Sequence, residues 1–170
     1  MSNKKLVSER EMDVPAAKIW KIVTDDFGDV SKWHPEIVSS KITSEDSSIK
    51  SGLERFCDYS MNGKRWAKER LEDYDPENMS FTLNMLEVKD IPMDPEHCHA
   101  KYKVEDLGNG RSKLIVESHI RTKPAMLATF FVPFLKGAMK DMFLGISHHA
   151  STGERVDSYV IKRLKKEGKS

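Results

Sequence analysis

The chain has 170 residues, of which 38% are hydrophobic and 32% are charged. This length suits one globular domain, which removes roughly 70% of its unfolded surface from water. The formal net charge of +1 gives no reason to expect nucleic acid or an anionic membrane surface as the main partner. The most apolar run, residues 124–135, is shorter than the roughly 20 residues of a membrane-spanning helix, so we predict no integral membrane contact.

The cysteine usage is typical of an intracellular protein. Cys57 and Cys98 are the two cysteines, and they form no CxxC motif, which favours reduced thiols over a disulfide framework. The first residues, MSNKKLVSEREMDV, lack the apolar centre of a signal peptide. Together these observations predict a cytoplasmic location.

A change of hydrophobic period predicts the first elements. Residues 5–12 alternate as a strand does, and Pro15 then stands where proline is favoured in the first turn of a helix. Apolar residues at helical spacing predict a helix over residues 16–27. A second short helix covers residues 30–33, because Pro35 disfavours helical geometry at the residue before it.

Six segments of strand length follow, and turn signals such as Asn62-Gly63 join them as antiparallel neighbours. The six segments are residues 37–43, 53–61, 64–74, 80–88, 97–106 and 112–122. After Pro124 the helical period returns, with Pro133 as a kink or a restart. The basic residues 162–170 are predicted to form a solvated, frayed terminus.

These elements predict an α+β fold. A curved antiparallel sheet of about seven strands carries two short helices after its first strand, and a long C-terminal helix lies in its concave face. The space between helix and sheet is either a filled core or a ligand cavity. The helix residues predicted to face the sheet are Leu135, Ala138, Met139, Met142 and Ile146. The side chains predicted to be either core or the wall of a pocket are Met126, Met139, Met142, Phe130, Phe131 and Phe143.

Several stretches, taken in this order, resemble one superfamily. PAAKIWKIVTDDFGDVSKWHPEI is similar to the opening of the START-like helix-grip (SRPBCC) superfamily, and GLER, ERL and Asp75 are similar to its middle. The superfamily includes birch-pollen-allergen, polyketide cyclase/dehydrase, lipid-transfer and abscisic-acid-receptor-like members, and the resemblance covers residues 5–151. It implies one ligand-binding domain over residues 1–153, followed by a basic tail over residues 154–170.

The resemblance also implies roles for single residues. It places Glu69 where receptor-like members have a cavity-facing carboxylate that reaches the ligand through water. It places His34 near the cavity mouth, and Arg55, Cys57 and Tyr59 on an inward face. The loops that close the receptor pocket differ, since this chain has SMNGKRW and IPMDPEHC there. Hormone sensing and phosphatase inhibition are therefore not expected.

A carboxylate on the drier face of a strand is the feature that decides the interpretation. Alternation puts Arg65, Ala67, Glu69 and Leu71 on one face. Either Glu69 forms a structural ion pair with Arg55 or Arg65, or these charges line a solvated cavity and orient a ligand. We favour the second interpretation, because two arginines and a glutamate are costly to bury without water.

The predicted ligand-binding side chains share the inward faces of the strands and of the long helix. They are Glu69, Arg55, Arg65, His34, Cys57, Tyr59, Ala67, Leu71, Phe81, Leu83, Met85, Cys98, Ala100, Tyr102, Val116, Met139, Met142, Phe143 and Ile146. His34, Met61 and residues 91–96 are predicted to form the rim of the cavity.

Other polar side chains are weaker candidates, and we predict neither a metal nor a cofactor. His97 and His99 share the outer face of their strand and have no third ligand. His148 and His149 stand at the end of the long helix, where an imidazolium caps the helix dipole. The two cysteines have no histidine partner for nucleophilic catalysis and are predicted to be small core residues.

Two functions from different classes fit these residues. The first is the binding or carriage of a small hydrophobic or amphipathic molecule, such as a lipid, isoprenoid, polyketide or aromatic metabolite. The second is a cyclase or dehydratase without metal or cofactor, in which Glu69, with His34, moves a proton. We favour the binder, because one inward carboxylate without an evident acid/base partner is a poor catalytic set. Monomer and dimer both stay open.

Overall fold

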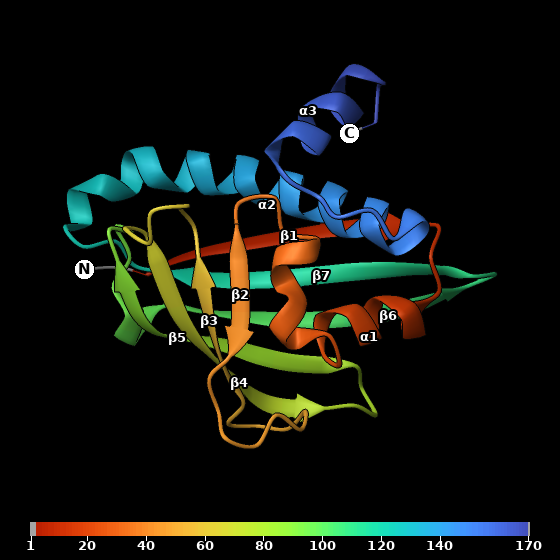
Figure 1. Cartoon of the computed structure of the whole chain (residues 1–170), viewed down its shortest axis with the longest axis horizontal. Helices are drawn as coiled ribbons and strands as arrows, with labels where there is room; N and C mark the ends of the chain where they lie inside the picture. Colours follow the sequence, from red (N-terminus) through yellow and green to blue (C-terminus); the bar gives the residue numbers. More distant parts are fainter. Residues whose placement is uncertain (1–2, 170) are drawn as a thin grey trace.

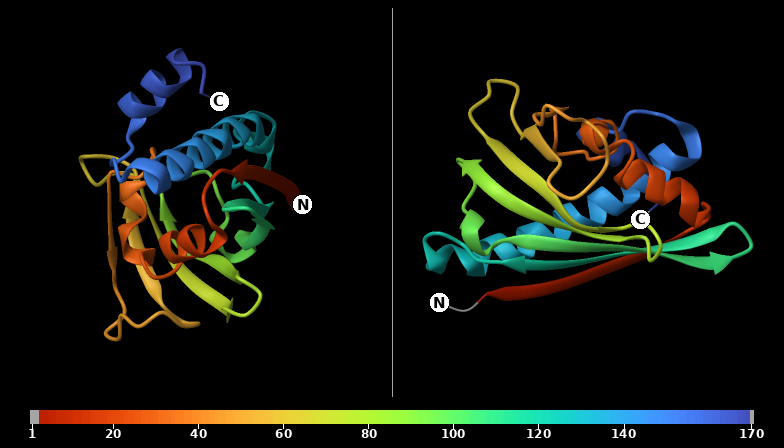
Figure 2. Two further views of the ribbon diagram at one scale, coloured as in Figure 1. Left: turned by 90° about the vertical axis from the view of Figure 1, so that its right-hand side faces the viewer. Right: turned by 90° about the horizontal axis from the view of Figure 1, so that it is seen from below.

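The computed structural model describes residues 3–169, and its strands form one seven-stranded antiparallel sheet in the order β1-β7-β6-β5-β4-β3-β2. The strands are β1 (Lys4–Met12), β2 (Ser39–Ile42), β3 (Glu54–Asp58), β4 (Trp66–Asp75), β5 (Ser80–Lys89), β6 (His99–Gly108) and β7 (Arg111–Ile120). The long helix α2 (Ala128–Thr152) crosses one face of the sheet (Figure 1), and the sheet curves round it (Figure 2). This arrangement confirms the predicted α+β helix-grip fold.

Each strand from β2 to β6 pairs with the next one along the chain, as the turn signals predict. β1 instead joins the free edge of β7, with Met12 opposite Ser112. Two elements, α1 (Ala16–Val23) and the 3-10 helix η1 (Phe27–Lys32), carry the chain from β1 to the opposite edge of the sheet, where β2 begins.

The first helix ends earlier than its hydrophobic spacing predicts. α1 buries one apolar face, including Ile19 and Val23, and stops at Val23 instead of residue 27. Phe27 is still buried, but it begins η1, and its carbonyl accepts a hydrogen bond from Arg55 Nη1 at 3.1 Å. This hydrogen bond ties the start of η1 to β3.

α2 is the predicted long helix, and Pro133 lies inside its second turn without ending it. Met142 and Ile146 are buried and Met139 is packed against the same core, which confirms the predicted inner face. At Gly145, α2 lies so close to the end of η1 that a Cβ atom would overlap the Trp33 carbonyl oxygen. Among the helices of residues 3–169, none is both long enough and apolar enough to cross a membrane.

The prediction of a frayed C-terminus is wrong for residues 162–166. They belong to a helix, α3 (Ser158–Lys166), which the Asp157 side chain caps by accepting the backbone N–H groups of Tyr159 and Val160. The physical reason is a second small core, since apolar side chains at helical spacing pack on Leu144 of α2. This core contains Leu144, Val156, Val160, Ile161 and Leu164.

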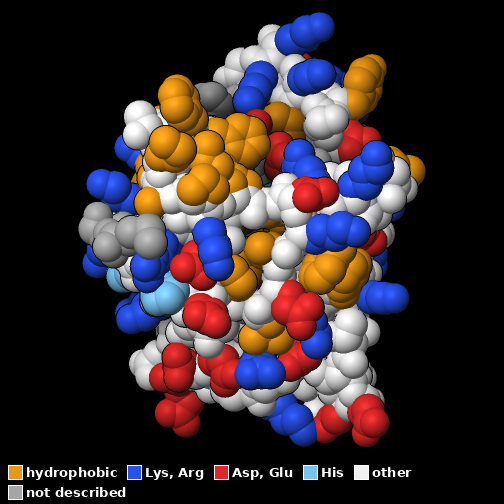
Figure 3. All heavy atoms as spheres, turned by 90° about the vertical axis from the view of Figure 1, so that its left-hand side faces the viewer, with side chains coloured by type: hydrophobic (Ala, Val, Ile, Leu, Met, Phe, Trp, Pro, Cys, Tyr) orange, Lys and Arg blue, Asp and Glu red, His pale blue; other side chains and the backbone are white. Residues whose placement is uncertain are grey.

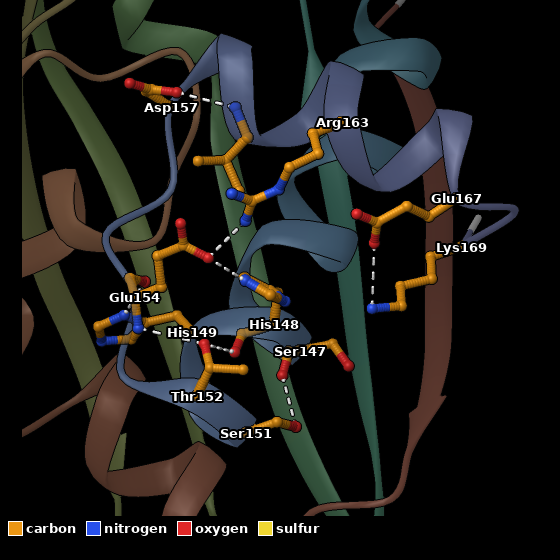
Figure 4. Close-up of polar contacts among 11 residues, drawn as sticks. Ser147, His148, His149, Ser151, Thr152, Glu154, Asp157, Arg163, Glu167 and Lys169 are labelled. Carbon is orange, nitrogen blue, oxygen red and sulfur yellow. Dashed lines mark hydrogen bonds and ion pairs between the residues drawn. The ribbon is translucent and has the colours of Figure 1, made fainter.

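Polar contacts hold the segment between α2 and α3 (Figure 4). One carboxylate oxygen of Glu154 accepts hydrogen bonds from His148 Nε2 and Arg163 Nη2, each at 2.6 Å. His149 Nδ1 donates to the Glu154 carbonyl at 2.8 Å. The hydrogen bonds from His148 and Arg163 lower the pKa of Glu154. Both histidines therefore fix the chain beyond the helix instead of capping its carbonyls, and Gly153, with a φ of 74°, ends α2.

Candidate functional site

A cavity with two adjoining chambers lies between the sheet and the N-terminal half of α2. The outer chamber has a volume of about 220 Å³ and the inner chamber about 140 Å³. The two chambers adjoin each other, because they share several lining residues. The shared residues are His34, Tyr59, Met85, Met93, Leu135 and Met139.

More than half of the predicted ligand-binding side chains line this cavity. Beside the shared residues, those in the inner chamber are Glu69, Leu83, Cys98, Ala100, Tyr102, Val116 and Met142. Arg65 lines the outer chamber only and is exposed. The strands β4 to β7 therefore supply one wall, and α2 supplies the other.

Seven predicted ligand-binding residues lie outside both chambers, in buried positions. They are Arg55, Cys57, Ala67, Leu71, Phe81, Phe143 and Ile146. Alternation correctly predicts that the strand residues among them point inward, but α1 and η1 fill that part of the concave face. Phe27 and Trp33 are buried there, and Trp33 shares a void of only about 10 Å³ with Arg55 and Phe81. The space on the concave face of the sheet is therefore filled by core side chains at one end and forms a cavity at the other.

The predicted rim is correct in part. His34 and residues 91–93 line the outer chamber, but Met61 does not, and its side chain is 91% exposed. Two further wall residues, Ser118 and Ile120, were missed although they share the alternation phase of Val116. Phe134 also lines the outer chamber. It could not be predicted, because no sequence signal distinguishes it from the other residues of its apolar run.

Of the two ion-pair partners predicted for Glu69, the structure places Arg55 beside it. Arg55 and Glu69 stand directly opposite each other on β3 and β4, and Arg55 Nε donates to Glu69 Oε2 at 2.7 Å. Both side chains are buried. Burial lowers the pKa of Arg55, but the Glu69 carboxylate outweighs this and raises the net pKa, so the guanidinium stays charged. The Phe27 ring lies 4.2 Å from that guanidinium.

One oxygen of Glu69 stays available to a ligand. Oε2 accepts from Arg55 and from the Cys57 thiol at 3.7 Å, whereas Oε1 accepts no hydrogen bond within residues 3–169. Because Glu69 lines the inner chamber, Oε1 can accept a hydrogen bond there. Burial raises the pKa of Cys57 and of Cys98, so both thiols are protonated. Cys57 is a small core residue, as predicted, whereas Cys98 lines the inner chamber.

His34 is a neutral hydrogen-bond donor at the junction of the two chambers. Its Nδ1 accepts the backbone N–H of Glu36 at 3.2 Å, which puts the ring proton on Nε2. Burial, and next the Arg55 charge, lower the pKa of His34 to about 3. The imidazole is therefore uncharged near neutral pH.

Two tyrosines add polar atoms to an otherwise apolar lining. Tyr102 stacks on Phe81 with ring centroids 4.8 Å apart, and Tyr59 meets His34 edge-on at 6.4 Å. Burial raises the pKa of Tyr102 to about 12 and that of Tyr59 well above its usual value, so both hydroxyls keep their protons. Neither hydroxyl has a hydrogen-bond partner in the part of the chain that the structure describes.

The predicted common face of His97 and His99 is wrong. Pro95 starts a 3-10 helix, η2 (Pro95–His97), so the strand begins only at His99. His99 stacks on His119 at 4.5 Å, while His97 Nδ1 lies 3.2 Å from Asp94. The two imidazoles therefore have different neighbours and do not form one metal site.

A group that could hold a metal ion is Asp94, Glu96 and His97, whose ligand atoms lie within 4.8 Å of one another. Asp94 also lies 3.7 Å from Arg121, whose charge competes with a cation. None of these three residues belongs to the polar group of the inner chamber.

Comparison with known proteins agrees with this geometry. The sequence profile of the family described as polyketide cyclase / dehydrase and lipid transport matches residues 4–147. The chain belongs to this family. A search of curated proteins found no match. Family membership supports a role in ligand binding or cyclisation, and the chemistry of the cavity has to decide between them.

Solved structures share the fold at low sequence identity. The aromatase/cyclase Zhui from Streptomyces sp. R1128 has a TM-score of 0.73 at 13% identity, over 88% of this chain and 94% of that one. Ara h 8.0201 has a TM-score of 0.70 at 19% identity, over 89% and 99% of the two chains. An uncharacterized protein from Bacillus thuringiensis has a TM-score of 0.66 at 16% identity, over 86% and 98%. These likenesses establish the helix-grip fold.

Proposed function

We propose that this protein binds and carries a neutral amphipathic small molecule in the two-chambered cavity. The apolar body of the ligand lies between α2 and the sheet, and a ligand hydroxyl donates to Glu69 Oε1. A cavity lined mainly by apolar side chains with a few polar groups is the usual composition of a small-molecule site. The observation that carries the proposal is the state of Glu69, which Arg55 neutralises while one oxygen stays free.

This arrangement selects the charge of the ligand. A ligand carboxylate would face the lone pairs of Oε1 and gain no hydrogen bond from them. A cationic ligand would find the carboxylate already compensated by Arg55. A neutral hydroxyl gains a charge-assisted hydrogen bond without either cost. His34 Nε2–H supplies a complementary donor for a carbonyl or ether oxygen of the same ligand.

Catalysis fits these residues less well. A cyclase or dehydratase of the type considered from the sequence needs a donor and an acceptor that exchange a proton near neutral pH. Near neutral pH the His34 imidazole is uncharged, because its pKa is about 3, and its Nδ1 already accepts a hydrogen bond from the Glu36 N–H. His34 is therefore a poor proton acceptor at that pH. Glu69 would have to act alone as the base while paired with Arg55. Ligand binding therefore fits these residues better than catalysis does.

The test uses three probes built on a straight chain of ten carbon atoms: decan-1-ol, its methyl ether and decanoate. Calorimetry should show the alcohol binding about tenfold or more tightly than the ether, and decanoate binding most weakly. Glu69→Gln should remove about 1 to 3 kcal/mol from alcohol binding and little from ether binding. Glu72→Gln, on the outward face of the same strand, is the matched control and should leave all three affinities unchanged.

Equal affinity for alcohol and ether, or an alcohol affinity that survives Glu69→Gln, would overturn the hydroxyl anchor. Turnover of a co-purified compound that drops a hundredfold in Glu69→Gln, with unchanged binding, would favour catalysis instead. Native mass spectrometry of the protein from its own host identifies such a compound.

A further inference from the structure

The start of α2 exposes a stripe of large apolar side chains. Met126 lies in the 3-10 helix η3 (Ala125–Leu127) just before α2 and is 77% exposed, and Phe130 and Phe134 of α2 are 78% and 57% exposed. Phe130 and Phe134 are four residues apart and therefore lie on one side of the helix. We call these three residues the α2 patch. Hydrophobic side chains gather over this end of the molecule (Figure 3). A contiguous patch of this kind marks an interaction site, whereas single exposed apolar residues do not.

The α2 patch borders the cavity. Phe134 lines the outer chamber together with Phe131 of the same helix and Ile91 of the β5–β6 loop. Met126 and Phe130 line neither chamber. A partner that covers the patch would therefore also lie over the outer chamber, although most of its contact would be with residues that do not form the ligand site.

Unpaired positive charge accompanies the patch. From Ser118 to Lys140 the chain contains no aspartate or glutamate. Lys123, Lys136 and Lys140 are exposed and form no ion pair with any residue of the described range 3–169. The formal net charge of +1 does not reveal this local excess, because it is a sum over the whole chain.

We propose that the α2 patch docks on an anionic membrane surface. Met126 and Phe130 would lie at the boundary between the lipid headgroups and the acyl chains, and the lysines would contact the headgroups. Exposed apolar side chains flanked by lysines are the composition that binds the interface of an anionic bilayer. The proposal goes beyond ligand binding, since docking needs no occupant in the cavity. It orients the outer chamber toward the bilayer.

A second copy of this chain suits the surface less well. A two-fold symmetric contact brings the same patch of each subunit together. The unpaired lysines of both copies would then face one another without acidic partners, which opposes association. An anionic lipid surface instead supplies the missing negative charge.

The experiment is sedimentation of the protein with phosphatidylcholine vesicles, with and without phosphatidylserine. The wild type should bind the phosphatidylserine vesicles more strongly, and added salt should weaken the binding. The double variant Met126→Ser/Phe130→Ser should lower the partition coefficient about tenfold or more. Lys136→Glu should weaken binding to phosphatidylserine vesicles and leave the weak binding to phosphatidylcholine unchanged.

Two controls separate docking from folding. Leu107→Ser removes an exposed apolar side chain near the β6–β7 turn, at the opposite end of the sheet (Figure 1), and should bind as the wild type does. The double variant should keep the wild-type melting temperature within a few degrees, because both side chains are exposed.

Vesicle binding that ignores phosphatidylserine, or that survives the double substitution, would overturn the proposal. A wild-type protein that binds no vesicles would also overturn it. One such outcome is a wild type that light scattering shows to be a dimer and that the double substitution makes monomeric. No ligand is present in this experiment, so its failure leaves the alcohol and ether comparison unaffected.

Discussion

The charge state of His34 depends on the folded structure. Burial and the Arg55 charge lower its pKa to about 3, whereas an unfolded chain holds the same imidazole with a pKa of about 6.5. Between these values the unfolded state binds a proton that the folded state does not. Stability contributed by neutral His34 is therefore complete above about pH 6.5 and is lost as the pH falls toward about 3.

We predict that His34→Gln flattens this part of the stability–pH curve. The wild-type slope from one such proton is at most about 1.4 kcal/mol per pH unit. Urea unfolding of both proteins across the window from about pH 7 to about pH 4 measures the difference. An imidazole NMR signal that titrates near pH 6.5 would contradict both this prediction and the role of His34 as a neutral donor.

The Arg55–Glu69 pair permits a separation of folding from binding. Arg55→Met leaves the Glu69 carboxylate buried without its partner and should cost about 3 to 5 kcal/mol of unfolding free energy. The double variant Arg55→Met/Glu69→Leu replaces the pair by apolar side chains and should recover most of that loss. Urea midpoints measure both variants. If the double variant is as unstable as the single one, the buried charge is not the cause.

The sequence predicts the residues of this pair but not their roles. Alternation predicts inward faces for Arg55, Arg65 and Glu69. Arg65 and Glu69 line the cavity, whereas Arg55 lies outside both chambers and pairs with Glu69. The choice between the two arginines depends on strand register, because Arg55 lies directly opposite Glu69 while Arg65 precedes the first residue of β4. A period of two residues cannot supply that register on its own.

At the scale of elements, the contact of α2 with η1 depends on one glycine. Gly145→Ala places a methyl group against the Trp33 carbonyl oxygen, which belongs to the backbone and cannot rotate away. We expect a loss of about 1 to 3 kcal/mol from this overpacking, more than the roughly 1 kcal/mol that alanine gains in a helix. Thermal or urea unfolding measures the loss.

Gly137→Ala is the matched control in the same helix. A Cβ atom at residue 137 meets nothing within 4 Å, so this variant should be more stable than the wild type by up to about 1 kcal/mol. If both glycine variants change stability in the same direction, the close approach at Gly145 does not constrain the fold.

Elements with a strong period were predictable, and their ends were not. The alternation of β3 and β7 and the inner face of α2 were correct because one side of each is buried. The end of α1 at Val23 and the 3-10 turn before His99 depend on tertiary contacts and on Pro95, which periodicity does not weigh. The filled part of the concave face could not be predicted, since it depends on where η1 packs.

At the scale of the whole molecule, α3 should behave as a separate unit of stability. It packs on the outer side of α2 through a core that is distinct from the main one, and none of its residues lines the cavity. Leu164→Asp puts an unpaired charge into that small core. Hydrogen exchange should become faster over residues 158–166 while the sheet stays protected, and decan-1-ol affinity should stay within about twofold.

Lys162→Asp, on the exposed side of α3, serves as its control and should leave exchange almost unchanged. Loss of protection throughout the sheet in Leu164→Asp would show instead that α3 belongs to the main cooperative unit. In that case residues 154–170 could not be described as a tail added to a complete domain of residues 1–153.

During synthesis, β1 leaves the ribosome long before its partner exists. Glu11 of β1 and Arg111 of β7, which bond across the pair, are a hundred residues apart in the chain. At about 5 to 20 residues per second, the nascent strand waits on the order of 5 to 20 s for β7. An unpaired strand can pair with other chains and aggregate. The sequence KKLVSEREM has charged side chains at five positions, which oppose such pairing. The newly made chain therefore stays open until β7 is made, and chaperones would meet it with its first strand unpaired.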